Sequence, residues 1–334
     1  MAQRRVFLKV VLGIGMAAGG AWSASAPLAA APASEAYLDP AKAGPEFALQ
    51  GEYLGKSGEQ MLGAQVIAQG NGSFQAVFLP GGLPGAGWDA KTRVRVNGKL
   101  AGDGVVFEGS SNGWAGQIGD GKLAGHDATG AKFSLSKVTR SSPTMGLKPP
   151  AEALVLFDGK SADAWVNGKM DENGLLVAGT RTKQEFHDFT LHVEFRTPFK
   201  PAGRGQERGN SGLYLLNRYE VQILDSFGLD GVFNECGALY RQKAPDVNMC
   251  LPPLTWQTYD IDFQAARWDP AGNKEKNAVI TIRHNGVVVQ NHYEITGPTG
   301  GAARRPEVGN TGPIAFQNHG NPVMLRNVWL VEKK

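Results

Sequence analysis

The stretch from Asn210 to Asp225, NSGLYLLNRYEVQILD, decides the fold of this chain. Two apolar runs flank a polar dipeptide in its middle, as they do where a chain reverses between two strands. Successive side chains of a strand point to opposite faces, so the second run has one apolar face and one polar face. The polar face carries Glu220 and Gln222. This face is either a solvated outer surface or the floor of a polar cleft.

Three other stretches repeat this alternation of apolar and polar residues. They are FTLHVEFRT from Phe189, IAFQNH from Ile314 and MLRNVWL from Met324, the last with imperfect alternation. Their polar faces carry groups that hydrogen-bond sugars and move protons, rather than only lysine and glutamate. If the strands share one sheet, we expect these side chains to converge on one site: Glu194, Arg196, Glu220, Gln222, Gln317, His319 and Arg326.

Each candidate also has a purely structural interpretation. Glu194 can pair with a cation, Arg326 can be a buried charge partner, and Glu220 can be a surface carboxylate. His319 precedes a glycine, and its role can be purely structural, in shaping a turn. Tyr240 is a candidate sugar platform, or a core residue. Spacing alone does not choose between these interpretations, because it does not show which strands are neighbours.

The composition favours many short strands joined by tight turns. Hydrophobic residues make up 42% of the 334 residues, glycine (45) and proline (19) are abundant, and charged residues reach only 19%. This mixture suits β structure better than long helices. Asn-Gly pairs at 71–72, 97–98 and 285–286 predict two-residue hairpin turns, because a type I′ turn needs positive φ at both positions. We therefore predict an all-β chain whose core closes as a sandwich or barrel.

The pattern of strands and linkers divides the chain into two β domains. Residues 45–140 read as a small antiparallel β domain, and residues 153–334 as a second, larger one. A Pro-bearing segment without periodicity, residues 141–152, is the expected linker. Residues 32–44, rich in Ala, Pro and Gly, are the expected flexible lead.

The first 31 residues have the features of an export signal. A basic pair, Arg4-Arg5, precedes an apolar run and then small residues with an A-x-A cleavage site. The sequence RRVFLK resembles a twin-arginine signal, which predicts export to the periplasm or beyond. An uncleaved membrane anchor is the alternative, but the apolar run is short and broken by glycines.

Removal of this signal leaves a formally neutral protein. Residues 1–31 hold three of the 34 basic residues and none of the 31 acidic ones. The mature chain therefore has no excess of positive charge, and nothing in it predicts binding to nucleic acid. We also expect no stable membrane span once the signal is removed.

The two cysteines, Cys236 and Cys250, lie in the same half of the chain. In an exported protein such a pair is first interpreted as a disulfide. Two free buried thiols are the alternative. No histidine or cysteine lies at zinc-ligand spacing from either residue, so a zinc site is not indicated.

The second domain resembles the 3-keto-disaccharide hydrolase domain family. The resemblance runs from Leu154 to Glu332 and includes LFDGKSADAW, DFTLHVEFR, GNSGLYLLNRYEVQILDS, CGALYRQKAPDVNMC, WQTYDIDF, HNGVVVQ, GPIAFQNHG and VMLRNVWL. The order of these motifs is that of the family. The resemblance implies a concanavalin A-like β-sandwich, or jelly roll, that binds its ligand on a concave sheet. It also implies action on sugars oxidised at the 3-position, and thus a small saccharide as the partner.

Two departures from the family pattern bear on the substrate. The second Leu of LYLLNRYE stands where the family often has Gln. The segment GPIAFQNHG has Ala315, Phe316 and Asn318 where a Leu-Gln-Asp-His-Gly pattern is commoner, although Gln317 and His319 are retained. We therefore expect an intact site with an altered substrate preference.

The implied keto substrate suggests a mechanism. Its C2 proton is acidic, so a base, either Glu220 or His319, removes it and the anomeric group leaves. A divalent metal such as Ca²⁺, Arg196 or Arg326 would stabilise the enolate. Glu194, Asn210, Gln222, Tyr240 and Gln317 complete the expected catalytic and binding set.

One other mechanism and two other functions compete with this mechanism. Ordinary two-carboxylate glycoside hydrolysis would set Glu220 opposite Glu194. A lectin-like binding protein would bind sugar on the same sandwich without turnover. A third alternative is a cell-envelope scaffold, which would show no dependence on sugar.

Overall fold

The computed structural model describes residues 35–108, 112–299, 307 and 309–334. The predicted export signal lies outside these ranges. Within them the chain is almost entirely β structure, with one short helix, α1 (Gly44–Leu49), and two single 3₁₀ turns, η1 (Pro40–Lys42) and η2 (Gly205–Glu207). No helix in the described ranges has the length and apolar character needed to cross a membrane.

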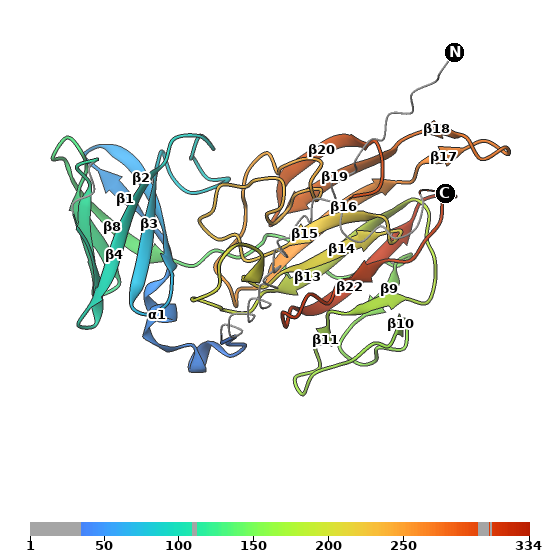
Figure 1. Cartoon of the computed structure of the whole chain (residues 1–334), viewed down its shortest axis with the longest axis horizontal. Helices are drawn as coiled ribbons and strands as arrows, with labels where there is room; N and C mark the ends of the chain where they lie inside the picture. Colours follow the sequence, from blue (N-terminus) through green and yellow to red (C-terminus); the bar gives the residue numbers. More distant parts are fainter. Residues whose placement is uncertain (1–34, 109–111, 300–306, 308) are drawn as a thin grey trace, which may run out of the picture. The chain divides into compact units, whose positions relative to one another are not determined.

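The first β unit is a closed barrel of eight antiparallel strands (Figure 1). Each strand pairs with the next along the chain, and β8 closes the barrel by pairing with β1. The prediction of a small antiparallel β domain is thereby confirmed. Its strands are β1 (Gly51–Ser57), β2 (Gln60–Ala68), β3 (Ser73–Pro80), β4 (Val94–Ala101), β5 (Gly104–Phe107), β6 (Ala115–Gly119), β7 (Lys122–His126) and β8 (Lys132–Val138).

Two of the three Asn-Gly pairs form hairpin turns as predicted. Both members of the pairs at 71–72 and 285–286 have positive φ, and each pair lies between two consecutive antiparallel strands. The prediction for the pair at 97–98 is wrong, because both residues lie inside β4. Gly98 is needed there for space: a Cβ on it would meet a ring atom of Phe107 at 2.5 Å.

The second β unit is a sandwich of two antiparallel sheets. The smaller sheet has five strands, in the order β10 (Trp165–Val166), β12 (Thr180–Thr182), β21 (Ala315–Phe316), β14 (Ser211–Leu215) and β15 (Tyr219–Ile223). The larger sheet has seven strands, in the order β11 (Leu176–Val177), β22 (Met324–Glu332), β13 (Phe189–Arg196), β16 (Gln257–Gln264), β19 (Ala278–His284) and β20 (Val287–Ile295), with β9 (Leu154–Phe157) also paired to β22. A separate hairpin joins β17 (Arg267–Trp268) and β18 (Lys274–Lys276).

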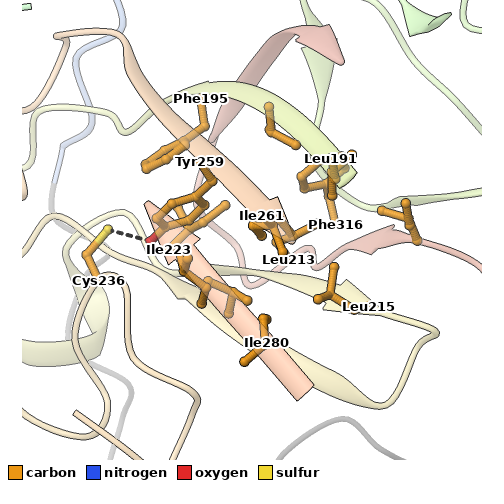
Figure 2. Close-up of a cluster of buried hydrophobic side chains, with 14 of the residues drawn as sticks. Leu191, Phe195, Leu213, Leu215, Ile223, Cys236, Tyr259, Ile261, Ile280 and Phe316 are labelled. Atoms are coloured by element: carbon orange, nitrogen blue, oxygen red, sulfur yellow. Dashed lines mark hydrogen bonds between the residues drawn. The ribbon is translucent and has the colours of Figure 1, made fainter. Parts of the chain in front are cut away.

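The apolar faces of the two sheets form one core. In Figure 2, Leu191, Phe195, Tyr259 and Ile261 of the larger sheet face Leu213, Leu215 and Ile223 of the smaller sheet. All of these residues are nearly or fully buried. The alternation seen in the sequence therefore marks the inner face of each sheet correctly, as expected for a sandwich.

The predicted convergence of seven polar residues in one sheet is wrong. Glu194, Arg196 and Arg326 belong to the seven-stranded sheet, whereas Glu220 and Gln222 belong to the five-stranded one. Since the inner faces of both sheets meet in the core, the two polar groups point away from each other. The sandwich thus presents two chemically different outer faces.

The predicted disulfide is also wrong. Cys236 and Cys250 are free thiols, each at most 1% exposed. The Cys236 sulfur lies 3.1 Å from the Tyr259 hydroxyl, a contact drawn in Figure 2. The Cys250 sulfur lies 3.5 Å from the backbone oxygen of Leu224. Both thiols act as small core residues with weak polar partners.

Candidate functional site

A continuous row of side chains crosses the outer face of the five-stranded sheet. Cross-strand pairing sets its members side by side, in the order Val166, Arg181, Ala315, Tyr214 and Glu220. Directly paired residues have Cβ atoms about 5 Å apart, so Tyr214 and Glu220 are neighbours. Arg181 lies two strands, or roughly 10 Å, from Tyr214.

Gly212 leaves a hollow beside this row. It pairs with Gln222 on β15, and its carbonyl accepts a hydrogen bond from the Gln317 backbone N–H at 2.9 Å. A Cβ on Gly212 would meet Glu220 Oε1 at 2.5 Å and the Tyr214 ring at 2.9 Å. The Glu220 carboxylate and the Tyr214 ring therefore both reach over the glycine, which any larger residue would prevent.

Glu220 is a buried carboxyl group with few stabilising partners. It is 3% exposed, and no ion pair neutralises it within the described residues. Burial raises the pKa of Glu220 to about 7, and the nearby Tyr214 hydroxyl opposes this rise only in part. A carboxyl group with a pKa near 7 can exchange a proton at neutral pH, as a general base or acid must.

The Tyr214 hydroxyl is buried and has no hydrogen-bond partner of ordinary geometry among the described residues. Burial, the charge of Glu220, a hydrogen-bonding contact with Glu220 and the neighbouring Tyr240 raise the pKa of Tyr214 well above its usual range. The hydroxyl therefore keeps its proton. Because an unsatisfied buried hydroxyl is costly, it is a natural donor to a bound ligand or water.

A row of amides continues the site beyond the carboxylate. The Gln222 amide lies 3.0 Å from Gln206 Oε1 and 3.2 Å from Asn210 Oδ1 on one side. On its other side lie Glu220 Oε1 at 2.9 Å and the Ser211 carbonyl at 3.0 Å, both acceptors. The amide nitrogen fits best on that second side, where it donates to the Glu220 carboxylate. Asn210 and Gln222 thus form one polar group with Glu220.

Two elements hold the surrounding loops in place. A buried ion pair between Arg208 Nη2 and Asp225 Oδ2, at 2.6 Å, ties the loop before β14 to the end of β15. Residues 237–240 then run alongside β15, where the Tyr240 N–H donates to the Glu220 carbonyl at 3.1 Å. Tyr240 is therefore only partly buried and borders the site, instead of lying in the core.

A cavity of about 340 Å³ opens on the same face. Its lining includes Tyr214, Gln317 and Arg181, so it extends from Tyr214, the cross-strand neighbour of Glu220, towards β12. Arg181 is exposed and forms no ion pair with the described residues. The cavity therefore has a cationic end at Arg181, and its other end lies at Tyr214, next to Glu220.

The structure does not bring His319 into this group. Its side chain is exposed in a turn after β21, and its carbonyl accepts a hydrogen bond from Asn321. Neither His319 nor Glu220 lines the cavity, but Glu220 is buried beside Tyr214, which does, whereas His319 is exposed to solvent. The geometry thus favours Glu220 over His319 as the proton-transferring group.

Comparison with known proteins supports a carbohydrate site. The family model described as a 3-keto-alpha-glucoside-1,2-lyase-like domain matches residues 152–331. The chain belongs to this family. We call residues 152–331 the lyase-like domain, and membership places it among carbohydrate-processing domains.

Solved structures similar to the lyase-like domain come from Parabacteroides distasonis and carry the description of candidate glycosyl hydrolases. One is 34% identical, covers 55% of this chain and 85% of its own, and superposes with a TM-score of 0.50. Two others are 17% and 18% identical, with TM-scores of 0.42 and 0.40. They cover 55% and 54% of this chain and 94% and 99% of their own. No curated protein matches the chain.

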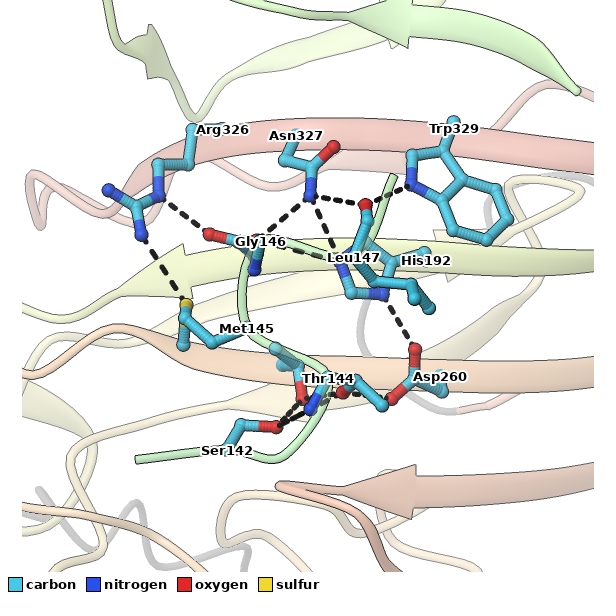
Figure 3. Close-up of polar contacts among 12 residues, drawn as sticks. Ser142, Thr144, Met145, Gly146, Leu147, His192, Asp260, Arg326, Asn327 and Trp329 are labelled. Atoms are coloured by element: carbon cyan, nitrogen blue, oxygen red, sulfur yellow. Dashed lines mark hydrogen bonds and ion pairs between the residues drawn. The ribbon is translucent and has the colours of Figure 1, made fainter. Parts of the chain in front are cut away.

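The opposite face of the lyase-like domain is covered by the chain itself. Residues Ser142–Leu147, which we call the covering segment, cross β16, β13 and β22 (Figure 3). The Gly146 N–H donates to Glu194 Oε1 at 2.6 Å, and the Thr144 hydroxyl donates to Asp260 Oδ2 at 2.6 Å. The linker predicted from its prolines is therefore docked on the sheet along this segment.

Glu194 lies beneath the covering segment and is fully neutralised. Besides Gly146, it accepts hydrogen bonds from Arg326 Nε at 2.6 Å and Asn327 Nδ2 at 2.8 Å, and His192 lies 3.7 Å away. Burial alone would raise the pKa of Glu194, but these donors outweigh it and lower the pKa to about 2. The structure therefore favours the purely structural interpretation of Glu194, in which it pairs with a cation. That cation is Arg326.

The imperfect alternation of MLRNVWL has a physical cause. The pairing of β13 with β22 shifts by one residue between His192 and Glu194, which marks a β-bulge. Asn327 adopts a φ of 45° at the bulge. This extra residue places Arg326 and Asn327 together on the outer face, where both donate to Glu194.

Sequence reasoning missed Tyr214, Gly212 and Arg181. The first two were detectable, because Asn210, Gly212 and Tyr214 alternate with apolar residues in NSGLYLL and so share the face of Glu220 and Gln222. Arg181 lies on a three-residue strand, which is too short to show an alternation. Within the described ranges, no three His, Cys, Asp or Glu side chains gather as they would around a metal ion.

Proposed function

We propose that the lyase-like domain cleaves the glycosidic bond of 3-keto-glycosides, including 3-keto-disaccharides, by elimination followed by addition of water. The observation that carries this proposal is the Glu220 carboxyl group. It is buried, has a pKa of about 7 and lies over Gly212 beside Tyr214, which lines the cavity. Membership of the lyase-like family supports the keto substrate.

The chemistry requires one base in the first step. The 3-ketone acidifies the C2–H bond, and the Glu220 carboxylate takes that proton. The electron pair forms a C1=C2 double bond as the C1–O bond breaks, and the departing alcohol takes a proton. Water then adds to C1 while C2 is reprotonated, so the net reaction is hydrolysis. Glu220 exchanges the proton it took with solvent before the second step, so the proton added to C2 comes from solvent.

The remaining groups on this face bind and orient the sugar. The Tyr214 hydroxyl is placed to donate to the oxygen on which negative charge develops. The amides of Gln222, Asn210 and Gln317 can bind sugar hydroxyls. Arg196 and Arg326 project from the other sheet, so they do not reach the same sugar, contrary to the expected enolate contact.

Two-carboxylate glycoside hydrolysis fits the structure less well. That mechanism needs two carboxyl groups about 5 to 9.5 Å apart on either side of the bond. Glu220 and Glu194 lie on outer faces of two sheets whose backbones are themselves about 10 Å apart. Elimination needs only the single carboxylate that the five-stranded sheet provides.

A direct experiment uses a 3-keto-glucoside and the unoxidised glucoside, each incubated with the purified protein in D₂O and followed by NMR. We expect cleavage of the keto sugar only, with deuterium incorporated at C2. Cleavage without label at C2 would contradict elimination, and cleavage of both sugars would contradict the keto requirement. A parallel incubation with EDTA shows whether a metal contributes.

Binding without cleavage of either sugar would favour the lectin-like alternative. In that case chemical shifts of the sugar would change on addition of protein, while no product formed. Absence of both binding and cleavage would leave the scaffold alternative.

We also propose that the protein is exported before it acts. The basic, apolar and small-residue regions of residues 1–31 support this location. Expression of the full chain followed by cell fractionation is the test. Recovery of the mature protein from the periplasm or medium is expected, and its retention in the cytoplasm at full length would contradict the proposal.

A further inference from the structure

Two arginines and a tryptophan form a cluster on the seven-stranded sheet, at the edge of the covered face. Arg196 ends β13, and Met324, its partner on β22, lies beside it. Trp256 immediately precedes β16 on the other side. The guanidinium carbons of Arg196 and Arg326 lie 5.0 and 4.1 Å from the centre of the Trp256 ring. One indole thus holds two positive charges close together.

No described carboxylate lies within ion-pair distance of Arg196, and only Asp171 and Asp39 act on its charge from farther away. Its Nε is buried without a hydrogen-bond partner, and it makes no ion pair with any described residue. Arg326, in contrast, is paired with Glu194 at 2.6 Å. Burial, together with the charge of Arg326, lowers the pKa of Arg196, and the more distant charges of Asp171 and Asp39 offset this only in part.

The rest of the chain does not provide the missing anion. Residues 1–34, 109–111, 300–306 and 308, which lie outside the described ranges, contain no aspartate or glutamate. A carboxylate from these segments therefore cannot complete the cluster. A counter-ion in direct contact with Arg196 would therefore come from a ligand, since Asp171 and Asp39 act on it only from beyond ion-pair distance.

The cluster lines a cavity of about 1110 Å³. Acidic residues also border it, but three of them are engaged locally. Asp171 accepts hydrogen bonds from two backbone N–H groups of its own turn, Asp39 caps η1, and Glu35 accepts from the Tyr37 hydroxyl. The fourth, Glu172, is exposed. The acidic rim thus leaves Arg196 unpaired and exposes the cationic wall to a ligand.

We infer that this cavity binds an acidic saccharide through its carboxylate or sulfate group, with Arg196 as the main anchor and Trp256 and Arg326 beside it. A guanidinium fork matches the paired oxygens of either group. The volume exceeds what a lone anion needs and suits a ligand of saccharide size. Its identity as a saccharide rests on the proposed function.

This anion subsite is separate from the Glu220 site. The two lie on opposite outer faces of the sandwich, so one sugar unit cannot occupy both. The subsite would therefore hold a different ligand, or another part of a long one. Its occupancy does not require cleavage and can be measured alone.

Isothermal titration calorimetry with the full protein tests the inference. The probes are glucuronate, glucose 6-sulfate, glucose and sodium sulfate, and the variants are Arg196→Gln and Arg283→Gln. Arg283 is an exposed arginine on β19 that lines neither cavity, so it is a matched control. We expect saturable binding of an acidic sugar that is weakened at least about tenfold in Arg196→Gln and unchanged in Arg283→Gln.

The two acidic sugars distinguish carboxylate from sulfate recognition, and glucose tests the need for charge. Binding of sodium sulfate alone, with no gain from the sugar, would contradict the saccharide assignment. Equal affinity of the wild type and Arg196→Gln for all probes would contradict the subsite itself. Neither outcome bears on cleavage of a keto sugar, so the two proposals fail independently.

A second variant guards against a folding artefact. Arg196→Lys keeps the charge but loses the fork, so we expect affinity between those of the wild type and Arg196→Gln. The Arg196 Nε has no hydrogen bond to lose. Thermal unfolding of both variants should therefore stay close to that of the wild type, and unchanged affinity in these folded variants would overturn the inference.

Discussion

Glu220 and Glu194 lie in similar sequence patterns, but their surroundings in the structure have opposite effects on their pKa values. Each lies on the polar side of an alternating strand and is almost fully buried, at 3% and 1% exposure. Yet burial raises the pKa of Glu220 to about 7, whereas hydrogen-bond donors overcome burial and lower the pKa of Glu194 to about 2. The difference lies in the neighbours, because among the described residues no cation pairs with Glu220, whereas Arg326 is bound to Glu194.

The comparison shows which buried carboxylate is available for chemistry. A carboxylate with a full set of donors is stable in its charged form and has little tendency to take a proton. One that is buried without a cation takes up a proton near neutral pH, at a cost to stability. We therefore assign the proton transfer to the face of Glu220 and the structural role to the face beneath the covering segment.

The largest effect should come from Glu220→Gln. The amide keeps the shape but cannot accept a proton, so we expect the turnover of a 3-keto-glucoside to fall by about 10²- to 10⁴-fold. Glu294→Gln, on the exposed side of β20, is the matched control and should keep full activity. Retained turnover in Glu220→Gln would remove the proposed base, while unchanged sugar affinity with lost turnover would support it.

The pH dependence of kcat/KM tests whether Glu220 acts as a base or as an acid. If the carboxylate form of Glu220 is the base, kcat/KM should rise with pH and level off above about 7, where the group is ionised. A profile that instead falls with rising pH would assign Glu220 the role of an acid.

Next in size is the effect of Glu194→Ala on folding. This change leaves Arg326 and His192 without their shared carboxylate beneath the covering segment. Removing one partner of a buried pair typically costs about 3 to 5 kcal/mol in the free energy of unfolding. Denaturant unfolding measures it, with Glu294→Ala as a control expected to change the free energy by less than about 0.5 kcal/mol. A loss as small as the control's would show that the network under the covering segment contributes little.

The pH dependence of stability should separate Glu220 from a neutralised carboxylate. Its pKa is raised from 4.5 to about 7 on folding, so the native state holds a proton that the unfolded state releases. Its contribution to stability is full below pH 4.5 and is lost as the pH rises through 7. As the pH rises from 4.5 to 8, the free energy of unfolding of Glu220→Gln should therefore increase relative to that of the wild type by about 3 kcal/mol. Parallel stability curves for the two proteins would contradict the raised pKa.

The smallest effect should come from loosening the covering segment. Thr144→Val removes the hydroxyl that donates to Asp260 and lies 2.9 Å from the Thr258 hydroxyl. We expect a loss of about 1 to 2 kcal/mol in the free energy of unfolding. Ser141→Ala, at an exposed neighbouring position, is the control. Equal stability of the two variants would mean that these hydrogen bonds add nothing.

The fold was largely predictable because its signals are local. Strand alternation in Phe189–Arg196 and Tyr219–Ile223 identified the inner faces, and two of three Asn-Gly pairs formed turns. The third failed because Gly98 serves cross-strand packing against Phe107, which spacing along the chain does not show. The free cysteines show the same limit of the sequence, because a disulfide depends on the geometry between distant segments.

The site was predictable only in part because sheet membership is a long-range property. Glu220, Gln222 and Asn210 come together since they lie on one hairpin, β14 and β15. Glu194, Arg196 and Arg326 have equally suitable side chains but belong to the other sheet. No pattern within a strand records which sheet it joins, and the covering segment gave no periodic signal that it would dock.

The covering segment also sets where this molecule can be divided. The family match begins at residue 152, after Ser142–Leu147 has already crossed the larger sheet. A gene fusion or truncation made at that boundary would discard the segment and open Glu194, His192 and Asp260 to water. Any transplantable version of this sandwich must therefore start before Ser142, so the smallest interchangeable unit is longer than the stretch its relatives share.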